Sequence, residues 1–253
     1  MEIYYAITFL MLGTILGSFY NVVGYRLPKG ESILYPASHC PNCNHHLGPL
    51  ELIPIFSFLL QKGKCTKCGL KISWFYPIFE LSTGVLFAIA YLIFGMSLEF
   101  LIAITFISMI LIIIISDYQY MIIPDEVLIV SIILLAIEIF FLKGFVGLEL
   151  ALLNGVIAFF SMFLLKKFGD FLFKKESMGG GDIKLLFIFG LVLGWQMAIM
   201  SIFIGSFIGL PISLIILHKK KNNIVPFGPF LSAGALIILL TKMDLNSIIN
   251  ILR

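Results

Sequence analysis

The sequence predicts an all-α polytopic membrane protein with about eight transmembrane helices. Of its 253 residues, 60% are hydrophobic and only 12% are charged, and the mean hydropathy is +1.08. A water-soluble domain averages roughly 45–50% apolar and about 25% charged residues. Apolar segments of membrane-crossing length also recur along the chain. This composition excludes a disordered chain, a collagen-like chain and a basic nucleic-acid-binding surface, and the net charge of +3 is too small to indicate a polyanionic partner.

Eight apolar segments account for the predicted helices. Seven have the length of about 20 residues that a membrane-crossing helix needs. The eighth, 183–194, is shorter and follows a run of three glycines. At 1.5 Å per residue it spans roughly 20 Å, so we expect it to start inside the membrane or to lie where the bilayer is thinned. The seven long segments lie near 3–24, 77–95, 98–116, 124–142, 146–165, 196–217 and 225–241.

The basic residues predict the orientation of these helices. With eight spans, every Lys and Arg except Lys143, Lys242 and Arg253 falls on one side, in the loops 25–75, 117–123, 166–182 and 218–224 or just beside them. Because cytosolic loops carry the excess of Lys and Arg, these loops are predicted to face the cytosol. Seven spans would place Lys219–Lys221 on the opposite face, which favours eight.

The long first loop divides the chain into three predicted parts. These are a first transmembrane helix at 1–24, a cytosolic region with all four cysteines at 25–76, and a transmembrane core at 77–253. The middle segment is the one part of the chain that could form a separate soluble unit.

The four cysteines form two CxxC pairs, Cys40–Cys43 and Cys65–Cys68. Two such turns suit a tetrahedral Zn²⁺ site, because each aims two thiolates at one point. Disulfides or unrelated thiols are the alternatives, and the reducing cytosol disfavours disulfides. With four protein ligands the site is closed, so we expect the zinc to stabilise the loop and not to activate water. The flanking histidines could compete as ligands or could be solvated: His39, His45 and His46.

Asp117 is the first acidic residue that needs a functional explanation. It follows the apolar run 111–116 at the C-terminal end of a predicted span. A carboxylate there meets the negative end of the helix dipole, which costs about 0.3–1 kcal/mol or more when buried. The alternative is a loop residue that reaches water.

Asp182 is the second. It follows Gly179-Gly180-Gly181 and begins the short apolar segment, so it could be an ordinary helix N-cap after a flexible loop. However, glycines such as Gly179 and Gly181 allow a substrate strand to lie close to the carboxylate. Lys184 opposes the helix dipole and indicates a charge partner nearby. Asp117 and Asp182 map to the same membrane edge, where two carboxylates sharing one proton could activate water against a peptide carbonyl.

These features resemble those of the type IV prepilin peptidases, which are membrane aspartyl proteases of the GxGD type. The resemblance covers nearly the whole chain. The matching segments, in order, are Gly17–Val23 with Tyr25–Pro28, Cys40–Cys43 with His46, Glu51–Pro54, Cys65–Cys68, Ile72-Ser73, Tyr76-Pro77 with Glu80, Asp117, Ile123–Asp125, Gly179–Leu186 and Pro226–Phe230.

The resemblance implies that the protein cleaves a short basic leader from prepilins or pseudopilins at the cytosolic face of the bacterial inner membrane, with Asp117 and Asp182 as the catalytic dyad. Relatives with the cysteine region often also methylate the new N-terminus, with S-adenosylmethionine as donor. Asn21, Glu51 and Glu80 could serve that step, although packing or capping explains each as well. The alternatives are a protease without methyl transfer, or a non-enzymatic transporter or scaffold with a zinc module.

Overall fold

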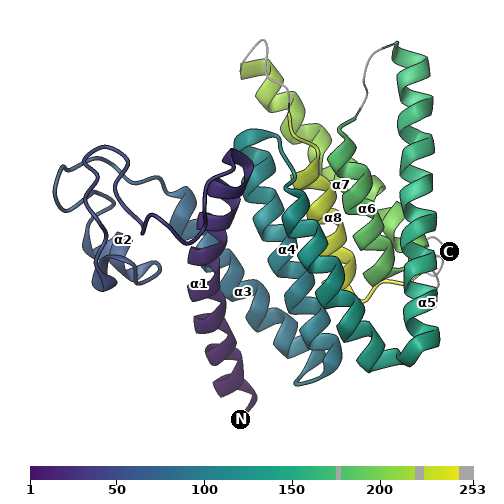
Figure 1. Ribbon diagram of the computed structural model, residues 1–253, viewed down its shortest axis with the longest axis horizontal. Helices are drawn as coiled ribbons and strands as arrows, with labels where there is room; N and C mark the ends of the chain where they lie inside the picture. The colour runs from purple at the N-terminus through teal and green to yellow at the C-terminus, as the bar shows by residue number, and fades with distance from the viewer. Residues whose placement is uncertain (175–177, 220–224, 245–253) are drawn as a thin grey trace. The chain divides into compact units, whose positions relative to one another are not determined.

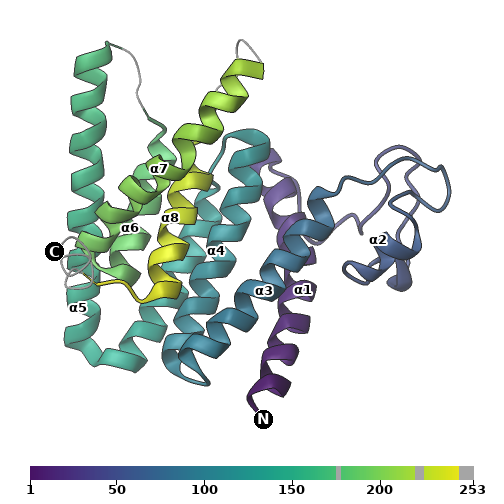
Figure 2. The same ribbon diagram turned by 180° about the vertical axis from the view of Figure 1, so that it is seen from behind.

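The computed structural model describes residues 1–174, 178–219 and 225–244, and its regular elements there are helices (Figures 1 and 2). The backbone divides into two compact units, which we call unit 1 (Met1–Met96) and unit 2 (from Ser97 onward). Four basic residues that entered the prediction of orientation lie outside the described residues: Lys175, Lys220, Lys221 and Arg253.

Unit 1 is built on the packing of α1 (Glu2–Arg26) against α3 (Phe75–Phe94). The two backbones approach closely where two glycines meet. A Cβ on Gly13 would lie 2.7 Å from the Gly84 Cα, and one on Gly84 would lie 2.6 Å from the Leu10 carbonyl oxygen. Small residues permit such close contact between membrane helices.

The cysteine region connects these two helices and belongs to the same unit. It contains the short helices η1 (Leu27–Lys29), η2 (Pro49–Glu51) and α2 (Phe56–Leu60). Phe58 of α2 packs edge-on against Trp74, with ring centroids 4.6 Å apart, immediately before α3 begins. The predicted boundary between the cysteine region and a core at 77–253 stays a prediction; in the structure, α3 packs against α1.

Unit 2 contains the remaining helices, which are α4 (Leu98–Tyr120), α5 (Asp125–Phe173), α6 (Gly180–Leu193), α7 (Trp195–Lys219) and α8 (Gly228–Thr241). Ser97 caps α4 by accepting the Phe100 N–H at 3.2 Å, which satisfies one of the first-turn donors. α4 contributes the fully buried Ile107, Ile110 and Ile113, and it packs against α5 and α8.

α5 is two helical arms that meet at Gly144, where φ is 68° and ψ is −170°. A left-handed φ breaks the helix, and glycine adopts it at little cost. The ribbon turns sharply there, so that the second arm runs back alongside the rest of unit 2 (Figure 1). The arms match the predicted spans 124–142 and 146–165.

Each of the eight predicted apolar segments is therefore helical over most of its described residues. Within the described part of the chain, five helices are long and apolar enough to cross a membrane by length and composition, namely α1, α3, α4, α5 and α7. α6 and α8 are shorter apolar helices of 14 residues each. The protein is an all-α, multi-pass type of membrane protein, and eight as the number of crossings stays a prediction.

Candidate active site

Asp117 lies on the last turn of α4 and Asp182 on the first turn of α6. Both are buried, with 7% of each residue exposed. α4 ends at Tyr120, and its C-cap residue Met121 has a left-handed backbone and donates its N–H to the Asp117 carbonyl at 2.8 Å. Gly179 is the extended N-cap residue of α6 and precedes Asp182 by three positions. Neither carboxylate has escaped into water, which excludes the solvated-loop interpretation of Asp117.

The two carboxylates converge on Gly228, the first residue of α8. A Cβ on Gly228 would lie 2.5 Å from Asp117 Oδ2 and 3.6 Å from Asp182 Oδ1. The two oxygens are thus no further apart than the sum of these distances, and the two charges interact electrostatically. The ends of three helices, α4, α6 and α8, meet at this point of unit 2 (Figures 1 and 2).

The N-terminal end of α8 gives Asp117 the positive partial charge that the C-terminal end of α4 does not provide. The C-terminal end of α4 presents its negative dipole end to the carboxylate. The N-terminal end of α8 faces the same group, and the Gly228 N–H donates to it. The orphan N–H groups of a helix start bind anions well. Lys166 of α5 interacts electrostatically with Asp182.

Two carboxylates at this separation can act as a general acid and a general base, one in each role. Like charges this close disfavour double ionisation, so the pair tends to hold one proton. An ionised member can take a proton from water while a protonated member polarises a carbonyl. Because Gly228 has no side chain, space remains beside both oxygens.

Lys184, two residues after Asp182, has the charge partner that its position indicated. Its Nζ contacts both oxygens of Asp125, at 2.7 and 2.8 Å. Asp125 is the first residue of α5 and Lys184 the fifth of α6, so the ion pair joins the N-terminal ends of these helices. Nearby, a Cβ on Gly181 would lie 3.0 Å from the Ile123 side chain, so this glycine allows the close approach of the α4–α5 connection.

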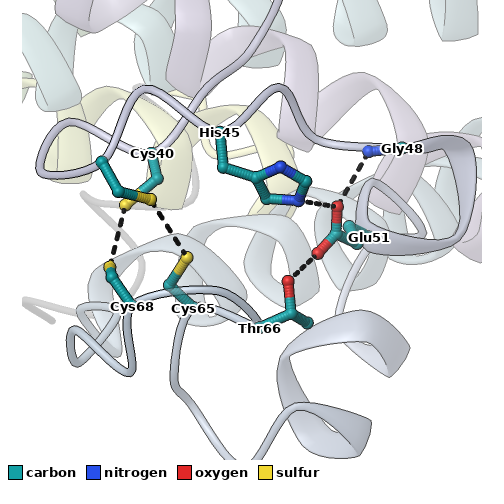
Figure 3. Close-up of polar contacts among 8 residues, drawn as sticks. Cys40, His45, Gly48, Glu51, Cys65, Thr66 and Cys68 are labelled. Carbon is teal, nitrogen blue, oxygen red and sulfur yellow. Dashed lines mark hydrogen bonds and ion pairs between the residues drawn. The ribbon is translucent and has the colours of Figure 1, made fainter.

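In unit 1 the four cysteine sulfurs gather in one cluster (Figure 3). All four lie within 4.8 Å of one another. The Sγ atoms of Cys40 and Cys68 are 3.7 Å apart, and those of Cys43 and Cys65 are 3.9 Å apart. A tetrahedral ion with Zn–S bonds of about 2.3 Å requires S···S edges of about 3.8 Å. All four are free thiols, so the disulfide alternative is excluded.

The two CxxC turns share one backbone conformation. The Cys40 N–H donates to the carbonyl five residues on, that of His45, and the Cys65 N–H donates likewise to Leu70. Asn44 and Gly69, each following the second cysteine of its pair, have φ of 54° and 71°. This repeated turn aims both sulfurs of each pair at the common centre.

Backbone N–H groups lower the pKa of two of the four cysteines, which favours the thiolate form that binds a cation. The Leu70 N–H lowers the pKa of Cys68 to about 6, and that of Cys43 lowers the pKa of Cys40. The His45 N–H lowers the pKa of Cys43, but burial and the other sulfurs raise it more, to about 11. A divalent ion removes this mutual repulsion, because coordinated thiols bind as thiolates.

Glu51 links the two halves of the cluster (Figure 3). Its Oε2 accepts hydrogen bonds from His45 Nε2 at 3.0 Å and from the Gly48 N–H at 2.9 Å. Its Oε1 accepts the hydroxyl of Thr66, which lies within the second CxxC turn, at 2.5 Å. The Thr66 and Gly48 donors lower the pKa of Glu51. His45 is therefore engaged with Glu51 and is not part of the sulfur cluster.

Comparison with known proteins matches both units. Residues 11–94 match the bacterial peptidase A24 N-terminal domain, and residues 104–214 match the type IV leader peptidase family. The relative named prepilin leader peptidase/N-methyltransferase in Bacillus subtilis (strain 168) is 39% identical over 90% of this chain and 90% of its own length. The chain belongs to the type IV leader peptidase family.

Relatives of the same name in this family occur in other bacteria. The Neisseria gonorrhoeae protein is 34% identical over 90% of this chain and 87% of its own length. The Pseudomonas aeruginosa protein is 30% identical over 91% of this chain and 88% of its own length. No solved structure is significantly similar to this chain. The first family match falls entirely within unit 1 and the second entirely within unit 2.

The structure adds two residues to the site that sequence reasoning did not assign. Gly228 stands between the carboxylates, although the motif Pro226–Phe230 received no role. A glycine followed by proline indicates a helix start, but it does not indicate the contact with the dyad. Asp125 appeared only as the end of the matching segment Ile123–Asp125, and the structure pairs it with Lys184.

Proposed function

We propose that this protein is a membrane aspartic endopeptidase that removes the leader from prepilins or pseudopilins, with Asp117 and Asp182 as its dyad. The convergence of both buried carboxylates on the start of α8 is the observation that supports it best. The ionised carboxylate takes a proton from water, the water oxygen attacks the scissile carbonyl, and the protonated carboxylate donates to the carbonyl oxygen.

The location of the dyad suits a substrate that is itself anchored in the membrane. Asp117 and Asp182 lie at the ends of apolar helices, not at their centres. A prepilin has its leader outside the bilayer and its apolar helix within it, so its scissile bond sits at the membrane surface. We place the dyad and the cysteine region at the cytosolic face of the inner membrane, because the basic loops lie on that side.

The same chain is proposed to methylate the new N-terminus, with S-adenosylmethionine as the methyl donor. The relatives' shared name joins both activities, and the match to the N-terminal family domain spans unit 1. The cysteine cluster is proposed to hold Zn²⁺ through Cys40, Cys43, Cys65 and Cys68. Its four-sulfur set leaves no open position, so its role is structural. Family membership favours an enzyme over the transporter or scaffold.

The deciding experiment incubates the purified full-length protein with a synthetic prepilin peptide and weighs the products. The wild type should release the leader. Asp117→Asn and Asp182→Asn should each lower the cleavage rate by about a thousandfold or more, because each removes one half of the acid–base pair. Asp244→Asn, a matched change at an exposed aspartate, should leave the rate unchanged. Cleavage that survives both dyad variants would overturn the assignment.

A further inference from the structure

Unit 1 contains a cavity of about 350 Å³ between its cysteine region and the adjoining ends of α1 and α3. Ligand pockets for small molecules begin at about this size. Asn21, Glu51 and Glu80, three polar residues far apart in the sequence, all line it. This cavity belongs to unit 1 alone, whereas Asp117 and Asp182 belong to unit 2.

Glu80 of α3 brings a buried carboxylate to the cavity. The residue is 8% exposed. Its Oε2 accepts the Ile55 N–H at 2.8 Å, and Ser18 is its other hydrogen-bond partner. Arg26 and Lys71 also line the cavity, but among the described residues no cation lies within ion-pair distance of Glu80. A buried carboxylate is costly unless a cation or donors compensate it.

Asn21 of α1 adds an unsatisfied acceptor to the same cavity. It is 2% exposed, and its Oδ1 has no hydrogen-bond partner within the described part of the chain. Its Nδ2 donates to the Tyr76 carbonyl at 3.5 Å, which holds the amide between α1 and α3. Buried polar atoms nearly always have partners, so an orphan facing a cavity indicates a ligand with a donor.

The apolar part of the cavity is aromatic and aliphatic. Tyr25 and Tyr76, both lining residues, stack with ring centroids 5.4 Å apart. Phe58, Leu52 and Ile72 complete this wall. Aromatic faces attract cations and stack on planar rings. The cavity thus combines a place for a flat ring system with a carboxylate and a free acceptor for a cationic group.

We propose that this cavity binds the methyl donor S-adenosylmethionine, with Glu80 and Asn21 facing its cationic, N–H-bearing end. The inference rests on the proposed function and deepens it, because it locates the methyl-transfer site in unit 1. The donor combines an aromatic base with a sulfonium and an ammonium group, which matches the aromatic wall, the buried carboxylate and the orphan acceptor.

The chemistry fixes the order of the two reactions. The nitrogen of the scissile peptide bond is not nucleophilic, so the amine exists only after the dyad has cut. An α-amino group has a pKa of about 7.7–8.0, so it can lose its proton to water near neutral pH. Its nitrogen then bonds to the methyl carbon while the carbon–sulfur bond breaks, and that electron pair stays on sulfur, leaving a neutral thioether.

The test measures binding by calorimetry on the purified full-length protein, with S-adenosylmethionine and, in parallel, the neutral product S-adenosylhomocysteine. Glu80→Gln keeps the side-chain shape and removes the charge. It should weaken binding of the methyl donor at least about tenfold and binding of the neutral product much less, because only the donor loses the attraction of its sulfonium charge. Glu31→Gln, at an exposed acid of unit 1, is the matched control.

Asn21→Ala supplies an independent variant that leaves Glu80 and its bond to Ile55 intact. It should weaken the binding of both adenosyl ligands several-fold, while the melting temperature without ligand stays close to the wild-type value. The proposal would be overturned if Glu80→Gln weakened the binding of both ligands equally, or if binding were unchanged in both variants. The proposal would also be overturned if the two variants weakened binding only of a cleaved pilin peptide with a free amine, because that amine would then be the bound cation.

Leader cleavage is measured on the same samples, so the two proposals fail separately. A wild type that cleaves the prepilin peptide but binds no methyl donor overturns the cavity assignment and leaves the peptidase standing. A wild type that binds the donor at Glu80 but cleaves nothing overturns the peptidase alone.

Discussion

The Lys184 ammonium contacts both carboxylate oxygens of Asp125, and this ion pair joins the N-terminal ends of α5 and α6. Asp182 lies two residues before Lys184, and Asp125 follows the short connection that leaves α4 just after Asp117. The pair therefore ties together the two chain segments that carry the dyad. About half of each side chain is exposed, at 51% and 59%, so its role is positional and its stability contribution is small.

Removing either partner of this pair should lower the rate of leader cleavage more than it lowers stability. For Lys184→Met and Asp125→Asn we expect about a two- to fivefold fall in kcat, since an exposed pair contributes up to about 1 kcal/mol. The double variant should be no slower than the slower single variant, because both changes remove one interaction. Lys143→Met, at an exposed lysine elsewhere on α5, is the control. Effects that multiply in the double variant would contradict the pairing.

Gly228→Ala should abolish activity while leaving the fold intact. The added methyl group would lie 2.5 Å from Asp117 Oδ2, so the carboxylate must move, and a displacement of about 1 Å can cost a hundredfold in rate. Alanine favours a helix more than glycine, so the melting temperature should not fall for backbone reasons. Gly180→Ala is the matched control, because a Cβ there meets nothing within 4 Å. Equal loss of cleavage in both variants would contradict the steric explanation.

The helices and the meeting of Asp117 with Asp182 could be predicted because hydrophobic runs and charged ends carry that information along the chain. Asp117 ends one apolar run and Asp182 begins another, and the basic loops place both ends on one side. The cysteine cluster was predictable for a similar reason, because each CxxC turn fixes its own geometry.

The part that could not be predicted depends on packing between segments distant in sequence. Gly228 reaches the dyad because three helix ends meet, and nothing in its local pattern encodes that contact. Asn21 and Glu80 are single polar residues on two apolar helices, and capping or packing explained them equally well. Only the close glycine contact of α1 with α3 and the folded cysteine region bring them to one cavity.

Loss of the metal should destabilise unit 1 and spare the chemistry of unit 2. We expect one zinc ion per chain in the wild type and much less than one in Cys40→Ser, as measured by elemental analysis. The melting temperature should fall by at least about 5 °C, because losing a structural site costs more than 1 kcal/mol. Lys67→Ala, inside the second CxxC turn, should keep its zinc. A Cys40→Ser protein with full metal content and unchanged melting would contradict the closed four-sulfur site.

Glu51 should make the stability of unit 1 depend on pH in the acid range. Its pKa is lowered in the folded protein, chiefly by the Thr66 hydroxyl and the Gly48 N–H, so the ionised form is the stabilising one. The contribution is complete above the unfolded pKa of about 4.3 and is lost as the pH falls through the lower folded value. The difference in melting temperature between wild type and Glu51→Gln should therefore be largest at pH 6 and should shrink below pH 4. Thr66→Val should narrow that difference at pH 6, because it removes the strongest donor to the carboxylate. Zinc content recorded at each pH separates this effect from metal release. A difference in melting temperature that stays constant from pH 6 to below pH 4 would show that the charge of Glu51 contributes nothing to the link between the two CxxC turns.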